Sequence, residues 1–226
     1  GIIKVNKPSH NKEDPMSIIT ISRQSGCEAN EVASILCQKL NYKLLNKELM
    51  MDLAEELRQE PSQEEDSAPV SKTANWLERV LNPFYNPNDP RYVTQKEISF
   101  EPGRALTVRQ VREIIQAAYA RDNIVIVGRG SQVILAGKPN VLHVRLIGSP
   151  EKRIQMWQKR ESLSYDEAKK RMEKRDRAHV DFVKNYFDAD ITQQGWYDLI
   201  ISIDHFTKDA IAELILQALP LMTFAS

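Results

Sequence analysis

The residue pattern best suited to chemistry is a short loop near the start of the chain. Residues 22–31 read Ser-Arg-Gln-Ser-Gly-Cys-Glu-Ala-Asn-Glu, between a β-branched run and apolar residues at helical spacing. A turn that opens a helix presents backbone amides without intrahelical partners, and such amides bind anions such as phosphate. This loop is therefore our first candidate binding site. Its candidate phosphate-binding residues are Arg23, Gln24, Ser25, Gly26, Cys27, Asn30 and Glu31.

Arginines on later segments form the second group of candidates. Arg129 follows a predicted strand and Arg153 lies near the start of a predicted helix, so both could bind phosphate through bidentate guanidinium groups. Arg160, Arg175 and the neighbouring carboxylate of Asp176 are candidate catalytic residues on the predicted helices that follow. An alternative stays open, because these helices also carry acidic residues and the arginines could form a solvated, salt-bridged face.

Strands and helices must alternate along the chain to position these residues. Apolar or β-branched runs at 17–21, 42–45, 123–127, 141–146 and 198–203 predict five strands. Helix-start signals at Thr107, Ser149, Ser164 and Thr207 predict helices between and after them. This alternation predicts an α/β fold with a five-stranded parallel sheet flanked by helices. Ligands of such sheets bind beyond the carboxyl ends of the strands, where the loop at 22–31 and Arg129 fall.

The 226 residues suffice for a single domain over 16–226, after a flexible N-terminal tail at 1–15. Residues 59–103 combine an acidic stretch with many prolines and asparagines, which predicts an irregular insert with a short helix at 71–81. Residues 150–190 predict a helical, lid-like region with a hinge near Ser162. The domain therefore has one core and two additions.

Composition narrows the expected partners. Lys plus Arg and Asp plus Glu both number 31, so no net charge attracts nucleic acid or a membrane surface. An anion must be bound locally, so we expect a nucleotide or another phosphate-containing small molecule as partner; a homodimer stays open. The two cysteines, with no long apolar run and no secretory signal, predict a reduced cytoplasmic protein.

Histidines and aromatic residues carry weaker signals. The four histidines show no spacing typical of zinc ligands, so we predict no metal site. Aromatic side chains at helical spacing usually fill a core, so we predict packing roles rather than base stacking for four of them. They are Trp157, Tyr186, Phe187 and Trp196.

Together these segments resemble the cytidylate kinase-like family of phosphate-loop nucleoside-monophosphate kinases. The similar segments are residues 19–33, the Leu-Leu-Asn-Lys-Glu-Leu run at 44–49, Ile-Val-Gly-Arg-Gly at 126–130, residues 149–153, the arginine-rich stretch to 175–176, and Tyr-Asp-Leu-Ile-Ile at 197–201. The resemblance implies a phosphate-loop kinase fold. It also implies transfer of the γ-phosphoryl group of ATP to a nucleoside monophosphate, a pyrimidine one, with Mg²⁺ as cofactor if the protein is active.

The loop departs from the family pattern at the positions that matter for ATP. A working phosphate loop reads G-x-x-x-x-G-K-[ST], in which the lysine neutralises the phosphates and the hydroxyl holds Mg²⁺. Laid on the loop of cytidylate kinases, Ala29 stands where the lysine should be and Glu31 stands where the Mg²⁺-binding hydroxyl should be. Glu28 adds a carboxylate that repels a triphosphate. Asn30 replaces the arginine that the cytidylate kinase-like family carries before the glutamate at the helix start.

Two hypotheses from different classes follow from these residues. The first is an active nucleoside-monophosphate kinase, in which Arg23 and the backbone around Gly26 hold ATP while Arg129 and the lid arginines hold the acceptor and the transferred phosphate. The degenerate loop predicts that such a kinase is weak or inactive. The second is a non-catalytic scaffold that binds a nucleotide or phosphate compound, or that associates with another protein. Glu28, Ala29 and Asn30 favour the second hypothesis.

Overall fold

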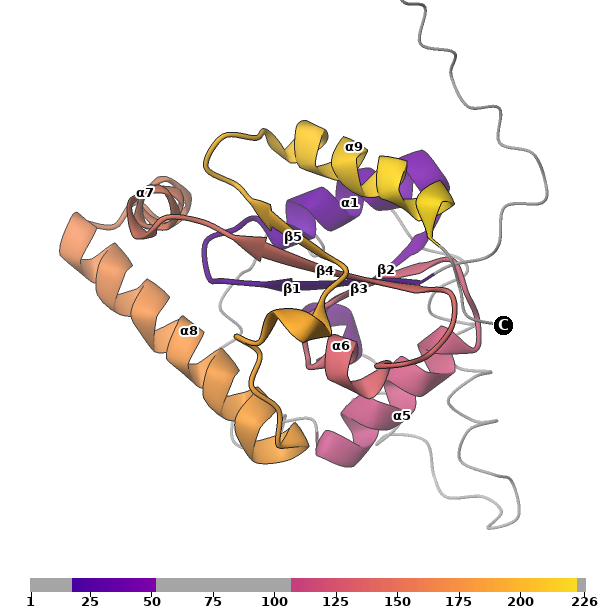
Figure 1. The fold of residues 1–226 in the computed structure, drawn as a ribbon. Helices are drawn as coiled ribbons and strands as arrows, with labels where there is room; N and C mark the ends of the chain where they lie inside the picture. Colours follow the sequence, from indigo (N-terminus) through magenta and orange to yellow (C-terminus); the bar gives the residue numbers. More distant parts are fainter. Residues whose placement is uncertain (1–17, 52–106, 223–226) are drawn as a thin grey trace, which may run out of the picture.

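A computed structural model describes residues 18–51 and 107–222, which form a parallel sheet covered by helices on both faces (Figure 1). Within this part of the chain the strands are β1 (Ile18–Arg23), β2 (Lys43–Leu45), β3 (Ile124–Val127), β4 (Val141–Ile147) and β5 (Leu199–Ser202). Their order is β2-β3-β1-β4-β5, and every pairing is parallel. The predicted five-stranded parallel sheet is therefore confirmed. The predicted tail at 1–15 and insert at 59–103 lie outside the described residues.

The central strand β1 fixes the register of the sheet. Ile19 lies opposite Val125 of β3 and Leu142 of β4, and all three side chains are buried. Parallel strands covered on both faces need apolar residues in succession, which the runs at 18–21 and 124–127 supply. The loops after β1 and β3 consequently leave the same edge of the sheet, side by side.

Helices complete two hydrophobic cores, one on each face of the sheet. On one face α1 (Ala29–Leu40) and α9 (Lys208–Ala218) pack on the strands through residues such as Val32, Leu36 and Ile211. The other face is covered by α5 (Val108–Tyr119), the short α6 (Ser131–Ile134) and a helix that begins at 47. The short α6 was not predicted from the sequence, because its four residues are too few to show a helical period.

Capping side chains begin the helices where the sequence predicts. Thr107 and Ser164 each form a capping box with the residue three positions later, Gln110 and Glu167. Ser149 and Thr207 each accept a hydrogen bond from the backbone N–H three residues on. These starts define α7 (Pro150–Glu161) and α8 (Tyr165–Phe187), the two helices of the region for which the sequence predicts a lid-like role.

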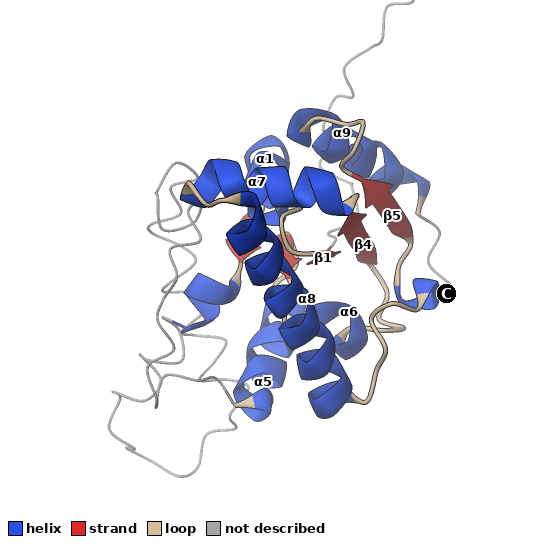
Figure 2. Ribbon diagram, turned by 90° about the vertical axis from the view of Figure 1, so that its left-hand side faces the viewer, coloured by secondary structure: helices blue, strands red, loops and turns tan. Residues whose placement is uncertain are grey.

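Helices α7 and α8 lie across the carboxyl ends of the strands, with α8 running from α7 towards α5 and α6 (Figure 2). Helix α7 and the first half of α8 share a small hydrophobic core, made of Ile154, Trp157, Ala168 and Met172. Trp157 is fully buried, which confirms its packing role, whereas Tyr186 is 54% exposed, so the prediction that it packs in the core was wrong. The Tyr186 ring contacts the Phe182 ring edge to face, with 5.1 Å between the ring centroids.

In the described residues, no helix combines the length and apolar character needed to span a membrane.

Candidate functional site

The loop after β1 turns sharply before α1 begins. Gly26 has φ +92°, and a Cβ atom there would lie 2.8 Å from the carbonyl oxygen of Arg153, so this position requires glycine. Glu28 also adopts the left-handed conformation, with φ 49°, although it is not a glycine. Glu28 occupies the N-cap position of α1 without a side-chain capping bond, and its carboxylate lies 3.5 Å from Lys208 Nζ.

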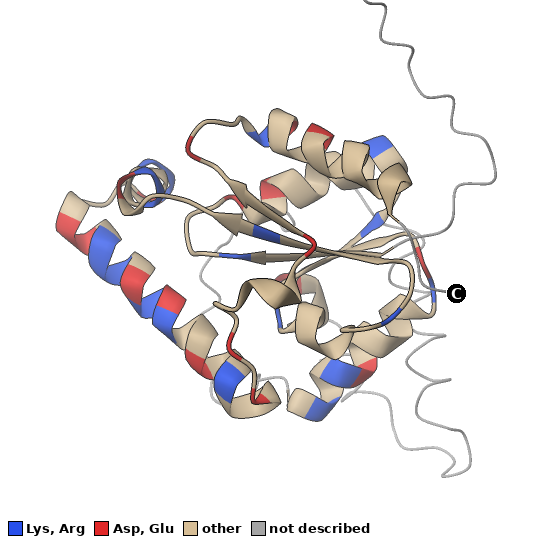
Figure 3. Cartoon of the chain, in the orientation of Figure 1, with Lys and Arg blue, Asp and Glu red and all other residues tan. Residues whose placement is uncertain are grey.

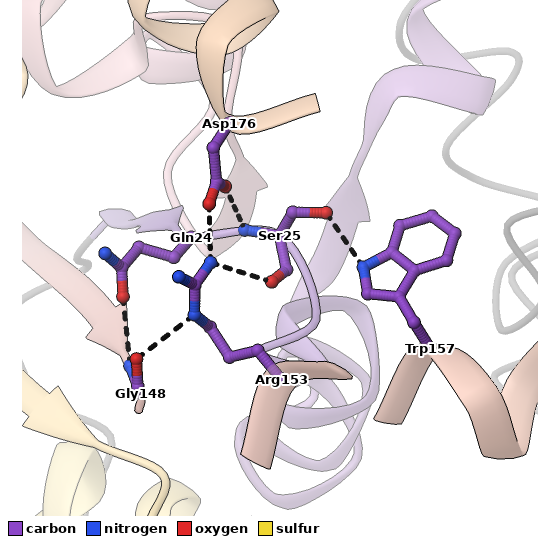
Figure 4. A network of polar contacts seen from close by, with 6 residues as sticks. All are labelled: Gln24, Ser25, Gly148, Arg153, Trp157 and Asp176. Carbon is purple, nitrogen blue, oxygen red and sulfur yellow. Dashed lines mark hydrogen bonds and ion pairs between the residues drawn. The ribbon is translucent and has the colours of Figure 1, made fainter. Parts of the chain in front are cut away.

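A carboxylate from α8 binds the backbone of this loop (Figure 4). The backbone N–H of Ser25 donates to Asp176 Oδ1 at 2.6 Å, and Arg153 Nη1 donates to Asp176 Oδ2 at 2.5 Å. Arg153 Nη1 also lies 3.3 Å from the carbonyl oxygen of Ser25, and its Nε donates to Gly148 O at 3.1 Å. The contact joins loop, α7 and α8, so three of the predicted site residues form one network.

Two further contacts hold the loop against its neighbours. Trp157 Nε1 donates to Ser25 Oγ at 3.1 Å, and the backbone N–H of Gly148 donates to Gln24 Oε1 at 3.0 Å (Figure 4). The guanidinium groups of Arg160 and Arg175 lie 4.1 and 4.8 Å from the centre of the Trp157 ring. Arg160 also pairs with Glu161 at 3.3 Å, so its catalytic role stays a prediction.

We expect Asp176→Asn to destabilise the fold by about 2–3 kcal/mol, because it leaves the Arg153 guanidinium, 7% exposed, without its carboxylate. Urea unfolding followed by circular dichroism measures the change. Asp181→Asn, an exposed position on the same helix, is the matched control and should change the free energy of unfolding little. Equal unfolding midpoints for the two variants would show that the ion pair contributes nothing net.

Cationic side chains gather beside this network, at the ends of β1, β2 and β3. We call Arg23, Lys47, Arg129 and Arg175 the cationic cluster. Besides burial, positive charges of other members lower the pKa values of Arg23, Lys47 and Arg129. Arg23 crosses directly over Gly128, where an added Cβ would meet its Nη1 at 2.0 Å. Among the described residues, Glu48 is the carboxylate that opposes these charges, and it favours the charged forms of Arg23, Lys47 and Arg129.

Burial makes the cluster electrostatically costly. Removal from water lowers the pKa of Arg23 and of Lys47, and it lowers the pKa of Arg129 to about 10, with Arg23 adding to the effect. Like charges in a desolvated place favour the entry of an anion, since each cation then gains a partner. Arg129 has a left-handed backbone, φ 59°, and its guanidinium lies 5.7 Å from the Phe182 ring on α8.

The structure adds three residues to this site that sequence reasoning did not single out. Lys47 and Glu48 open the helix that follows β2, and His179 lies on α8 among arginines. Glu48 Oε2 and His179 Nε2 are buried, and within the described residues neither has a hydrogen-bond partner. For Lys47 and Glu48 a signal existed, since both fall at the carboxyl end of a predicted strand. His179 gave none, because an isolated histidine on a charged helix has no recognisable spacing.

The remaining predicted loop residues lie on the α1 side. Asn30 is buried in the first turn of α1. Burial raises the pKa of the Glu31 carboxyl; its own backbone N–H opposes the shift and the Glu28 carboxylate adds to it. In the described part of the chain, no three His, Cys, Asp or Glu side chains come together as a set of metal ligands.

Cys27 is expected to be unreactive, although a helix N-terminus can activate a thiol. Burial raises its pKa from 9.0 to about 12, so the thiolate fraction near neutral pH falls about a thousandfold. We therefore predict slow alkylation by iodoacetamide in the folded protein and fast alkylation in urea. A Cys37→Ala background isolates the Cys27 signal. Rapid labelling of the folded protein would contradict the buried position of the thiol.

Charged residues of both signs alternate along α8 (Figure 3), so the salt-bridged interpretation of this helix holds for part of its length. Arg171 pairs with Glu161, and Lys184 pairs with Asp188 at 2.8 Å. Arg175 and Asp176 instead face the sheet and the loop. Both interpretations of the sequence therefore apply, each to different residues of one helix.

Comparisons with known proteins show which family and which proteins this chain is similar to. The model of the cytidylate kinase-like family matches residues 18–205. A cytidylate kinase of Methanosarcina mazei is 28% identical over 91 residues, which are 40% of this chain and 51% of that protein. The chain therefore spans about half the length of this curated relative.

Solved structures are similar over nearly the whole chain. An uncharacterized protein from Eubacterium ventriosum has a TM-score of 0.62 at 22% identity, over 92% of this chain and 99% of that one. A shikimate kinase from Acinetobacter baumannii, solved with shikimate, has a TM-score of 0.48 at 11% identity, over 92% and 95% of the two chains. The first of these likenesses supports the fold.

Proposed function

The chain belongs to the cytidylate kinase-like family, and we propose that it binds the phosphate group of a nucleotide on its cationic cluster but transfers phosphoryl groups from ATP weakly or not at all. The proposal has two parts, a retained acceptor-side phosphate site and a degraded ATP site. Each part rests on a different set of side chains.

The cationic cluster is the observation that carries the proposal. Glu48 favours the charged forms of Arg23, Lys47 and Arg129, and Arg175 adds a further positive charge beside Arg23 and Lys47. A phosphate monoester carries a charge of about −1.5 to −2 near neutral pH, which offsets the excess. Guanidinium groups also match phosphate geometry in a bidentate manner. A phosphate monoester is therefore the ligand class that this cluster fits.

Unsatisfied buried atoms support a ligand with hydrogen-bonding groups beyond the phosphate. Glu48 Oε2 and both polar atoms of the Gln132 side chain are buried without partners within the described residues. Buried polar groups normally find partners, so such atoms mark places that a ligand or water fills. Glu48 accepts and Gln132 both donates and accepts, which suits the hydroxyl and amino groups of a nucleoside.

The ATP side of the site fits its ligand poorly. Ala29 offers no cation, and Glu28 places a carboxylate at the loop where a triphosphate would bind. Glu31 stands where a hydroxyl would hold Mg²⁺, and burial raises the pKa of its carboxyl. These residues do not fit Mg²⁺-ATP as a working phosphate loop holds it, so no catalytic step is assigned to it.

Binding and turnover experiments test both parts of the proposal. Thermal shifts with CMP, UMP, dCMP and inorganic phosphate should show stabilisation, whereas Mg²⁺-ATP should give little. Arg129→Ala should weaken CMP binding about tenfold or more, since a charge-assisted bond contributes about 1.5–3 kcal/mol.

Arg109→Ala serves as the matched control for this change. Arg109 is exposed on α5 and pairs with Glu113, so its loss removes a charge without touching the cluster. Absence of any stabilisation by monophosphates or phosphate would overturn the acceptor-side assignment. Robust ADP production with a monophosphate acceptor would overturn the assignment of weak or absent transfer.

A further inference from the structure

His179 lies on the face of α8 that covers the ends of the strands. Three residues before it, Asp176 binds the loop after β1; three residues after it, Phe182 contacts the Arg129 guanidinium. Val183, one turn further on, is fully buried. Residues spaced three or four apart share one side of a helix, so His179 sits between two contacts that press α8 against the sheet.

Three arginines from different segments of the described chain act electrostatically on the His179 ring. Arg23 approaches from β1, Arg129 from the loop after β3, and Arg145 from β4. On α8 itself Arg175 lies one turn away, and the nearby carboxylate of Asp176 is already engaged by Arg153. Arg145 is also engaged, because it donates to Ile191 O at 2.7 Å and to the Tyr197 hydroxyl at 2.8 Å.

The ring is neutral in this environment. Burial and the three arginines lower the pKa of His179 to about 3, and a hydrogen bond to the backbone of Arg23 opposes the shift. Nε2 is buried and has no partner among the described residues. A bound anion would give His179 Nε2 a hydrogen-bond partner and would offset the charges of Arg23 and Arg129.

We propose that His179 Nε2 hydrogen-bonds directly to the phosphate bound by the cationic cluster, and that binding takes up one proton, which the ring and the phosphate share. The proposal rests on the proposed function, because it needs a phosphate on Arg23 and Arg129. When a dianion enters, it offsets the arginines that disfavour the imidazolium and supplies an acceptor for Nε2–H.

The proton balance is simple. Near neutral pH the free ring is neutral and the free monoester is largely dianionic. The complex holds one more proton than the separated components, and that proton comes from solvent. Linkage then requires the association constant to fall about tenfold for each unit by which pH rises, above the pKa of the free phosphate.

Calorimetry measures this proton directly. Inorganic phosphate and CMP are titrated into the protein in two buffers of different ionisation enthalpy, and the difference in observed heat gives the number of protons taken up. We expect about one proton for the natural protein at a pH about one unit above the phosphate pKa. We expect none for His179→Gln, which keeps a donor of similar reach but cannot be protonated.

The pH profile supplies a second readout. The natural protein should bind phosphate progressively more weakly as pH rises, whereas His179→Gln should show a nearly flat profile and weaker binding, by about tenfold, at the acidic end. His205→Gln, an exposed position before α9, is the matched control and should behave like the natural protein. Circular dichroism checks that each variant is folded.

The outcomes separate this inference from the proposed function. Phosphate binding without proton uptake, or with the same pH profile in the natural protein and in His179→Gln, would overturn the role of His179 and leave the cationic cluster as the binding site. Failure of the natural protein to bind phosphate or CMP at any pH would overturn both. Because the decisive measurement uses the natural protein, poor folding of a variant does not leave the inference untested.

Discussion

A loop that carries Glu28→Gly and Ala29→Lys together is expected to bind ATP about a hundredfold more tightly than the natural loop, if its backbone follows a phosphate-loop path. The first change removes a carboxylate that repels the triphosphate. It also gives the left-handed backbone at position 28, φ 49°, the residue that adopts it without strain. The second change supplies the missing cation, and a charge-assisted bond contributes about 1.5–3 kcal/mol.

Isothermal titration with Mg²⁺-ATP measures this gain, and the two single variants show how the changes combine. Ala136→Lys is the matched control, because it adds the same charge at an exposed position after α6. Ala29 is 4% exposed, so unfolding experiments must accompany the titration. If the double variant gains no affinity while remaining folded, the loop backbone itself no longer accommodates a triphosphate.

The elements of this fold were readable from local signals. Thr107 with Gln110, and Ser164 with Glu167, act over three residues, so the start of each helix follows from its own sequence. Short apolar runs in the sequence likewise predict the buried parallel strands. Only elements without a period of their own, such as α6, escaped prediction.

The site was only partly readable, because its contacts join residues far apart in the chain. Arg23, Arg129 and Arg175 stood out individually, yet nothing local indicates that they meet, or that Glu48 opposes them. The bond from Ser25 to Asp176 spans 151 positions. The low pKa of His179 results from burial and from arginines on β1, on β4 and in the loop after β3. These groups come together only when the chain folds. Sequence reasoning therefore identified candidates but not their partners.

Helix α7 and the first half of α8 share a hydrophobic core of their own, whereas Val183 near the end of α8 belongs to another core. Their core of Ile154, Trp157, Ala168 and Met172 is separate from the two cores that flank the strands. Regions with few contacts to the main core tend to open independently. Trp157 is the largest member of this small core and also bonds to the loop through Ser25.

Trp157→Ala is accordingly expected to lower the stability of the α7–α8 pair by about 3–5 kcal/mol, the usual cost of truncating a buried tryptophan. The change empties the centre of the small core, removes the bond to Ser25, and leaves Arg160 and Arg175 without the ring they face. Amide hydrogen exchange should rise in α7 and in the first half of α8 while β1, β3 and β4 stay protected.

Two further variants serve as controls for the effect of Trp157→Ala. Trp157→Phe keeps most of the apolar volume and loses the Ser25 bond, so it should cost about 1 kcal/mol. Trp196→Ala removes a half-buried ring outside this core and should leave exchange in α7 unchanged. Exchange that rises equally in the sheet and in α7–α8 would mean that the whole domain unfolds as one unit. In that case the core around Trp157 would not open separately from the sheet.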